Sequence, residues 1–145
     1  MQFRRRTECL FLSLLGMMVL STGCSQVLLP SARSAVEMFH LQLDTGNYDR
    51  IYEDADPAFQ ALGPESSAAH LFSVVHQRLG KVQASDMVGY QIQAGLTEIR
   101  VIMRYRSVFD RGTAQEDFIW NLLGSHARLV SYSIDSGGMN GEADQ

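Results

Sequence analysis

The hydrophobic residues of this chain change their spacing once, at Gly80. Between Ser31 and Leu79 they recur every three or four positions, as on one side of an amphipathic helix. After Gly80 they alternate with polar residues, which is typical of strands that bury one face. Helices followed by strands, without alternation between them, predict an α+β domain in which the helices pack on one face of an antiparallel sheet.

The helical part divides at its turn residues. The first helix begins at Ser31, ends at Thr45-Gly46 and carries an apolar stripe of Ala32, Val36, Phe39 and Leu43. A short helix follows Asn47, and Asp56-Pro57 opens another brief turn of helix. The last helix begins at Gly63-Pro64-Glu65, and Gly80 is its expected C-terminal cap.

The alternating part predicts a meander of four strands, with turns at Gly95, Arg111-Gly112 and Gly124-Ser125. A two-residue turn at Arg111-Gly112 pairs Tyr105 with Phe118 and Arg106 with Asp117. A turn around Ala94-Gly95 pairs Tyr90 with Ile99. Both pairings place apolar residues together on the inner face. That face is expected to hold Val82, Ala84, Asp86, Val88, Val130 and Tyr132, among others.

The first 24 residues are typical of a lipoprotein signal. Arg4-Arg5-Arg6 precede an apolar run from Cys9 to Leu20, which is too short to span a membrane as a helix. The segment ends Leu20-Ser21-Thr22-Gly23-Cys24 and looks like a bacterial lipobox. In such signals the chain is cleaved after the glycine and the cysteine is acylated, since a thiol is the strongest side-chain nucleophile near neutral pH. The alternative is a plain secretory signal with an incidental cysteine.

This signal defines the expected organisation of the chain. Residues 1–23 are a signal peptide, residues 24–30 a lipidated tether, residues 31–136 a single domain and residues 137–145 a disordered tail. The expected location is the cell envelope, with the membrane bound through the lipid on Cys24. Because Ser25 rather than aspartate follows the cysteine, resemblance to Gram-negative sorting signals favours the outer membrane, facing the periplasm.

Composition excludes several classes of function. The chain has 145 residues, enough for one domain, and a net charge of −4. A nucleic-acid binder needs a basic surface, so nucleic acid is not an expected partner. With only Cys9 and Cys24, neither a disulfide-rich scaffold nor a four-ligand zinc site is expected.

The sequence resembles small bacterial envelope lipoproteins of unknown function, from about Ala35 to Ser136. The resemblance rests on residues 43–48, 79–82, 105–109, 112–120 and 132–136, which include Leu43-Asp44-Thr45-Gly46-Asn47-Tyr48 and Tyr132-Ser133-Ile134-Asp135-Ser136. It implies a cystatin-like or nuclear-transport-factor-like fold, with helices packed into a curved antiparallel sheet. It implies no catalytic residue.

Two inner-face carboxylates are candidates for chemistry, Asp86 and Glu116. In the expected register they lie on the order of 16 Å apart, too far to act as an acid–base pair. Each is expected to sit at the mouth of a pocket or, as the favoured interpretation, to be hydrogen-bonded at the rim of the sheet.

Histidines and other motifs point to no catalytic or metal site. His70 and His76 are six residues apart on one helix and face different directions, and His40 is placed to pair with Asp44 one turn later. Neither a nucleophile elbow nor a phosphate-binding glycine loop is found. We therefore predict a protein that is not an enzyme and has no metal or cofactor.

Aromatic residues at the open end of the sheet suggest a cleft. Tyr105, Glu116 and Trp120 are its expected lining, together with Tyr52 or His76, although the same residues could form plain core. On the outer face, Arg100, Arg104 and Arg106 either contact an anionic envelope polymer or lipid headgroups or, as favoured, pair with neighbouring carboxylates. Ile102, Val108 and Ile119 on that face leave a homodimer or an envelope protein open as a partner.

These expectations together favour a membrane-anchored domain that binds without catalysis. The alternative is a small-ligand carrier or small enzyme that uses the cleft between helices and sheet.

Overall fold

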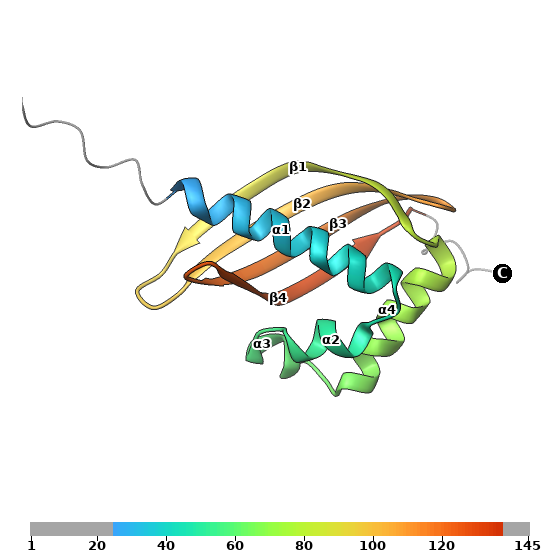
Figure 1. The fold of residues 1–145 in the computed structure, drawn as a ribbon, viewed down its shortest axis with the longest axis horizontal. Coiled ribbons are helices and arrows are strands. Elements are labelled where there is room, and N and C mark those ends of the chain that lie inside the picture. The colour runs from blue at the N-terminus through green and yellow to red at the C-terminus, as the bar shows by residue number, and fades with distance from the viewer. Residues whose placement is uncertain (1–24, 138–145) are drawn as a thin grey trace, which may run out of the picture.

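The computed structural model describes residues 25–137, with side chains from Leu28 onward. The predicted signal peptide, Cys24 and most of the predicted tail lie outside these residues. The elements follow in the order α1 (Ser25–Asp44), α2 (Tyr48–Glu53), α3 (Pro57–Gln60), α4 (Glu65–Leu79), β1 (Val82–Ala94), β2 (Ile99–Phe109), β3 (Gly112–Leu123) and β4 (His126–Asp135) (Figure 1). The strands form one antiparallel sheet in the order β1-β2-β3-β4, so the predicted α+β meander is confirmed.

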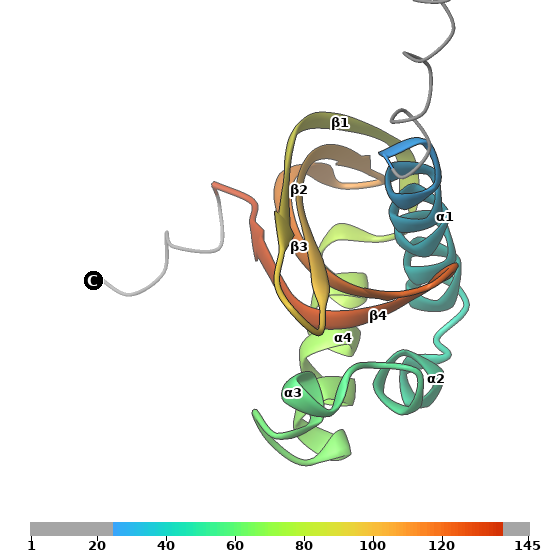
Figure 2. The same cartoon turned by 90° about the vertical axis from the view of Figure 1, so that its left-hand side faces the viewer.

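Helix α1 lies across one face of the sheet, which curves around it (Figure 2). The predicted stripe of Ala32, Val36, Phe39 and Leu43 is buried against that face. The helix begins at Ser25 and includes residues 25–30, which were predicted to be part of a tether. Leu28 and Leu29 pack against the core, which explains why the helix extends so far.

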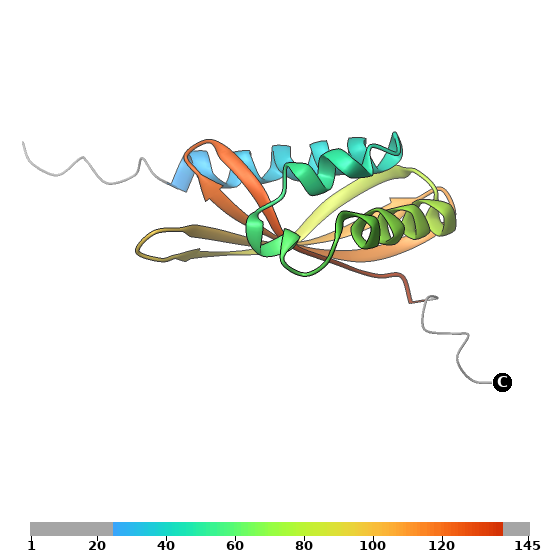
Figure 3. The ribbon, with the colours of Figure 1, turned by 90° about the horizontal axis from the view of Figure 1, so that it is seen from below.

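The remaining helices lie beside the edge strand β4, as Figures 1 and 3 show. Asp56 caps α3 by accepting a hydrogen bond from the backbone N–H of Ala58. Gly80 ends α4 with φ +81°, as predicted, and a Cβ at this position would lie 2.6 Å from Oδ2 of Asp110. The close approach and the positive φ both require glycine at this point.

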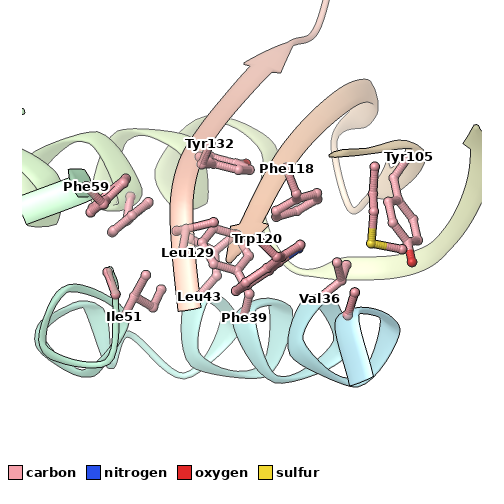
Figure 4. Close-up of a cluster of buried hydrophobic side chains, with 14 of the residues drawn as sticks. Val36, Phe39, Leu43, Ile51, Phe59, Tyr105, Phe118, Trp120, Leu129 and Tyr132 are labelled. Carbon is pink, nitrogen blue, oxygen red and sulfur yellow. The ribbon is translucent and has the colours of Figure 1, made fainter. Parts of the chain in front are cut away.

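An aromatic cluster forms the centre of the core between α1, α4 and the sheet (Figure 4). The ring of Phe39 lies 5.6 Å from that of Phe72, 5.2 Å from Phe118 and 4.7 Å from Tyr132, measured between centroids. Burying a side chain of this size stabilises a fold by roughly 1.5–3 kcal/mol. These contacts join both halves of the sequence into one core.

The β2–β3 hairpin turns one residue earlier than predicted, at Asp110-Arg111. Tyr105 therefore pairs with Glu116 and not with Phe118, although every side chain keeps its predicted face. Tertiary contacts fix this turn, because the Asp110 carboxylate accepts from the backbone N–H of Lys81 and the Arg111 guanidinium donates to carbonyls at the end of α4.

Strand β1 departs most from the predicted register, because it contains two bulges. The first lies between Val82 and Ala84 and the second between Met87 and Gly89. Each bulge moves the following side chains to the opposite face. Asp86 consequently pairs with Arg106 on the outer face, so its predicted inward position was wrong. The inner positions opposite Ser107 and Tyr105 belong instead to Ser85 and Met87.

Two further differences from the prediction arise from the length of a turn and from a third bulge. The β1–β2 turn is longer than expected, so Tyr90 pairs with Met103 and not with Ile99. A bulge opposite the Ile119–Trp120 step places Leu129 in the core in place of Val130.

Candidate functional site

The three residues predicted to line one cleft lie in three different environments. Trp120 lines a recess of about 700 Å³ between α1, α2 and the β3–β4 hairpin. Tyr105 lines a separate recess of about 340 Å³ between α1, β1 and β2. Glu116 is fully buried in the core, so its predicted place at the rim was wrong.

Glu116 is the centre of a buried hydrogen-bond network. Its Oε2 accepts from the Ser107 hydroxyl and lies 2.9 Å from Nε2 of His40. Its Oε1 accepts from the Tyr132 hydroxyl at 2.8 Å. Ser85 extends the network to β1, with its Oγ 3.0 Å from that of Ser107. One carboxylate thus links α1 to all four strands.

The carboxylate of Glu116 determines the protonation of the side chains that surround it. An ionised carboxylate only accepts hydrogen bonds, so Nε2 of His40 carries the proton in this arrangement. Burial, followed by the charge of Glu116 and its hydrogen bond, raises the pKa of Tyr132 well above its usual value. Tyr132 is therefore a neutral donor at physiological pH. The network satisfies a buried charge that would otherwise be very unfavourable.

The smaller recess borders this network, because His40 and Ser85 line it with Tyr105. Two charged residues of α1, Arg33 and Glu37, complete its wall. Burial raises the pKa of Tyr105, with Arg33 lowering it and Glu37 raising it by smaller amounts. A histidine oriented by a buried carboxylate is an arrangement able to accept a proton. This is the observation that keeps an enzymatic alternative open.

The larger recess combines apolar walls with an unused donor. Its lining includes Phe39, Ile51 and Leu129, and Figure 4 shows Trp120 in the cluster with these residues. The indole N–H of Trp120 is buried and has no hydrogen-bond partner within residues 25–137. At the edge of the recess, Arg128 makes no ion pair with any described residue. A ligand with an apolar body and a hydrogen-bond acceptor fits this lining.

Other residues singled out from the sequence have structural partners. Tyr52 donates to the carbonyl of Gly63, and the Tyr48 hydroxyl lies 3.0 Å from Nδ1 of His76, so neither Tyr52 nor His76 lines the recesses described above. The expected pair between His40 and Asp44 was wrong, since Asp44 accepts from the backbone N–H of Val82. Within the described part of the chain, no group of three acidic, histidine or cysteine residues is placed to hold a metal ion.

Two of the three outer-face arginines, Arg100 and Arg104, pair with carboxylates as favoured from the sequence, whereas Arg106 makes no ion pair with any described residue. Arg104 lies 2.7 Å from Asp117 and Arg100 lies 2.9 Å from Glu98. The partner of Asp117 is therefore Arg104 rather than the predicted Arg106, because the β2–β3 register differs.

Sequence reasoning missed His40 and Ser107 as partners of Glu116. The hydrophobic periodicity of the sequence places both residues at core positions. His40 is four residues after the buried Val36, and Ser107 continues the inner-face series of Met103, Tyr105 and Phe109. A polar residue at a predicted core position indicates a buried hydrogen-bond partner.

Within residues 25–137, none of the helices is both long and apolar enough to cross a membrane. Compared with the models of known protein families and with curated proteins, the chain has no match.

Proposed function

We propose that this chain is a membrane-anchored lipoprotein whose α+β domain binds a partner or ligand in the cell envelope without catalysis. The observation that carries the proposal is the N-terminal segment, with Arg4-Arg5-Arg6, the apolar run from Cys9 to Leu20 and the ending Thr22-Gly23-Cys24. The acylated cysteine would hold the domain at the membrane surface. If the cell is Gram-negative, Ser25 favours the outer membrane on its periplasmic side.

Binding is favoured over catalysis by the state of Glu116. Both oxygens of this carboxylate already accept hydrogen bonds, from three side chains, and the residue is fully buried. A carboxylate held in this way stabilises the fold and is not free to act on a substrate directly.

A second candidate function is a small-ligand carrier, favoured by the larger recess. A volume of about 700 Å³ lies within the range of small-molecule sites. The buried Trp120 N–H within that lining supports the same role, since an unpaired buried donor is normally satisfied by some partner.

The anchor is tested by replacing each of the two cysteines in turn. In cells supplied with labelled palmitate, the native chain and a Cys9→Ala variant should both incorporate label and fractionate with membranes. A Cys24→Ala variant should incorporate none and lose membrane association. Equal labelling of the two variants, or an unlabelled native chain, would refute the lipid anchor.

A further inference from the structure

We infer that one end of the domain, formed by the β1–β2 and β3–β4 turns and the start of α1, rests on the bilayer surface with Leu96 in contact with lipid. This end is called the hairpin end and comprises residues 25–29, 95–98 and 123–126. The inference rests on the proposed acylation of Cys24 and adds to it a fixed orientation of the domain.

The strand register places both turns at the same end of the sheet. Ala94 pairs with Ile99, Ile99 with Leu122, and Leu122 with Ala127. These four residues form one row across the sheet, directly beside the two turns. Figures 1 and 3 show both turns projecting in the same direction.

Helix α1 starts at this end and runs toward the other. Asp44, its last residue, accepts a hydrogen bond from Val82, and Val82 pairs with Phe109 at the far end of the sheet. Between the middle of the helix and Asp44, Ala35 and Met38 line the larger recess together with residues of the β3–β4 hairpin. The beginning of α1 in Figure 1 lies on the same side as the two turns.

The site of acylation is coupled closely to this end. Ser25 follows Cys24 directly in the sequence and is already the first residue of α1. Leu28 and Leu29 attach the first turns of the helix to the core. A lipid on Cys24 would therefore hold the hairpin end, and not the opposite end, at the headgroups.

The surface of the hairpin end suits a bilayer. Leu96 is fully exposed at the tip of one turn, and Leu123 is 46% exposed beside the other. The free energy falls when an exposed leucine moves from water into the boundary between headgroups and acyl chains. The negative charge of Glu98 in the β1–β2 turn does not oppose binding to an anionic bilayer, because Glu98 is paired with Arg100 at 2.9 Å. Arg128, two residues after His126 in β4, has no ion-pair partner among the described residues and is available to anionic headgroups.

The test uses the lipidated protein with one added cysteine, since the signal carrying Cys9 is removed and Cys24 is acylated. Leu96→Cys places a label at the hairpin end. Leu62→Cys is the matched control, because Leu62 is also an exposed leucine, at 75%, but lies between α3 and α4. Thr113→Cys is a second control beside the β2–β3 turn, at the opposite end of the sheet.

Each variant is labelled with an environment-sensitive fluorophore and reconstituted into phosphatidylethanolamine–phosphatidylglycerol vesicles, with or without nitroxide-bearing lipids. The label at Leu96→Cys should shift to shorter wavelength and lose most of its emission to the nitroxide lipids. The labels at Leu62→Cys and Thr113→Cys should change little. Circular dichroism checks that each variant is folded.

Flotation of the vesicles separates the two possible failures. Protein that does not float with vesicles refutes the lipid anchor. Protein that floats while its Leu96→Cys label is unquenched refutes the orientation alone. A Leu96→Cys label that shifts in wavelength but is not quenched by nitroxide lipids is covered by protein, and this result also overturns contact with lipid.

Discussion

Removing the carboxylate of Glu116 should destabilise the fold far more than removing its neighbour on the same strand. In a Glu116→Leu variant the hydroxyl of Tyr132 loses its acceptor, Ser107 keeps only Ser85, and His40 loses its hydrogen-bond partner. Leaving a buried donor unpaired costs about 1–3 kcal/mol. Tyr132 and His40 keep no other side-chain hydrogen-bond partner among the described residues, so we expect a total loss of about 3–5 kcal/mol.

The adjacent residue Asp117 provides the matched control. Its carboxylate lies on the outer face, 2.7 Å from Arg104, and its side chain is 33% exposed. Exposed ion pairs contribute about 0–1 kcal/mol, so Asp117→Leu should change the free energy of unfolding by no more than that. Both variants are measured by equilibrium unfolding in urea, followed through the fluorescence of Trp120, the only tryptophan of the chain.

A double-mutant cycle tests whether the network acts as a unit. Tyr132→Phe alone removes one hydrogen bond to a charged acceptor, at a cost of about 1.5–3 kcal/mol. Combined with Glu116→Leu, it also removes the isolated hydroxyl, so the double variant should lose at least about 1 kcal/mol less than the sum of the two single losses. Additive losses, or a Glu116→Leu variant as stable as Asp117→Leu, would show that the network does not stabilise the domain.

Two further predictions concern pH and ligand binding. Because the pKa of Tyr132 is raised, its neutral form stabilises the fold fully below about pH 10. This contribution is lost as the pH rises toward the folded-state pKa, by up to about 1.4 kcal/mol per pH unit. In urea titrations at alkaline pH, the free energy of unfolding of Tyr132→Phe should fall less steeply with pH than that of the native chain, and an equal slope would contradict the assignment. If the larger recess binds an apolar carboxylate, oleate should shift the emission of Trp120. Arg128→Gln should weaken oleate binding about tenfold, whereas Arg106→Gln on the outer face should have no effect. Emission that stays constant up to the solubility limit of oleate would exclude this ligand from the recess.

Local periodicity is sufficient to predict the elements of this fold. The three- and four-residue spacing before Gly80 and the alternation after it arise from the geometry of single helices and strands, so no distant residue is needed to recognise them. The same holds for Gly80, where the end of a helical pattern at glycine predicted the observed C-cap, which has a positive φ. The inner face of β2 and β3 followed directly from this alternation.

The bulges and the turn at Asp110-Arg111 follow from contacts between distant segments. A bulge adds one residue to a strand without a consistent sequence signal, so the pattern of β1 placed Asp86 on the wrong face. The β2–β3 turn is held by Lys81 and by the end of α4, which lie about thirty residues earlier in the chain.

The sequence by itself determined the class of fold, the order of its elements, the inner-face position of Glu116 and the motif at Cys24. Only the tertiary structure decided that Glu116 is buried, that His40, Ser107 and Tyr132 are its partners, and that Tyr105 and Trp120 line different recesses. The physical reason is the distance along the chain over which each property is determined. Periodicity reports which face of an element is apolar, whereas a buried charge depends on donors that packing brings from other elements, here from 76 residues away in the case of His40.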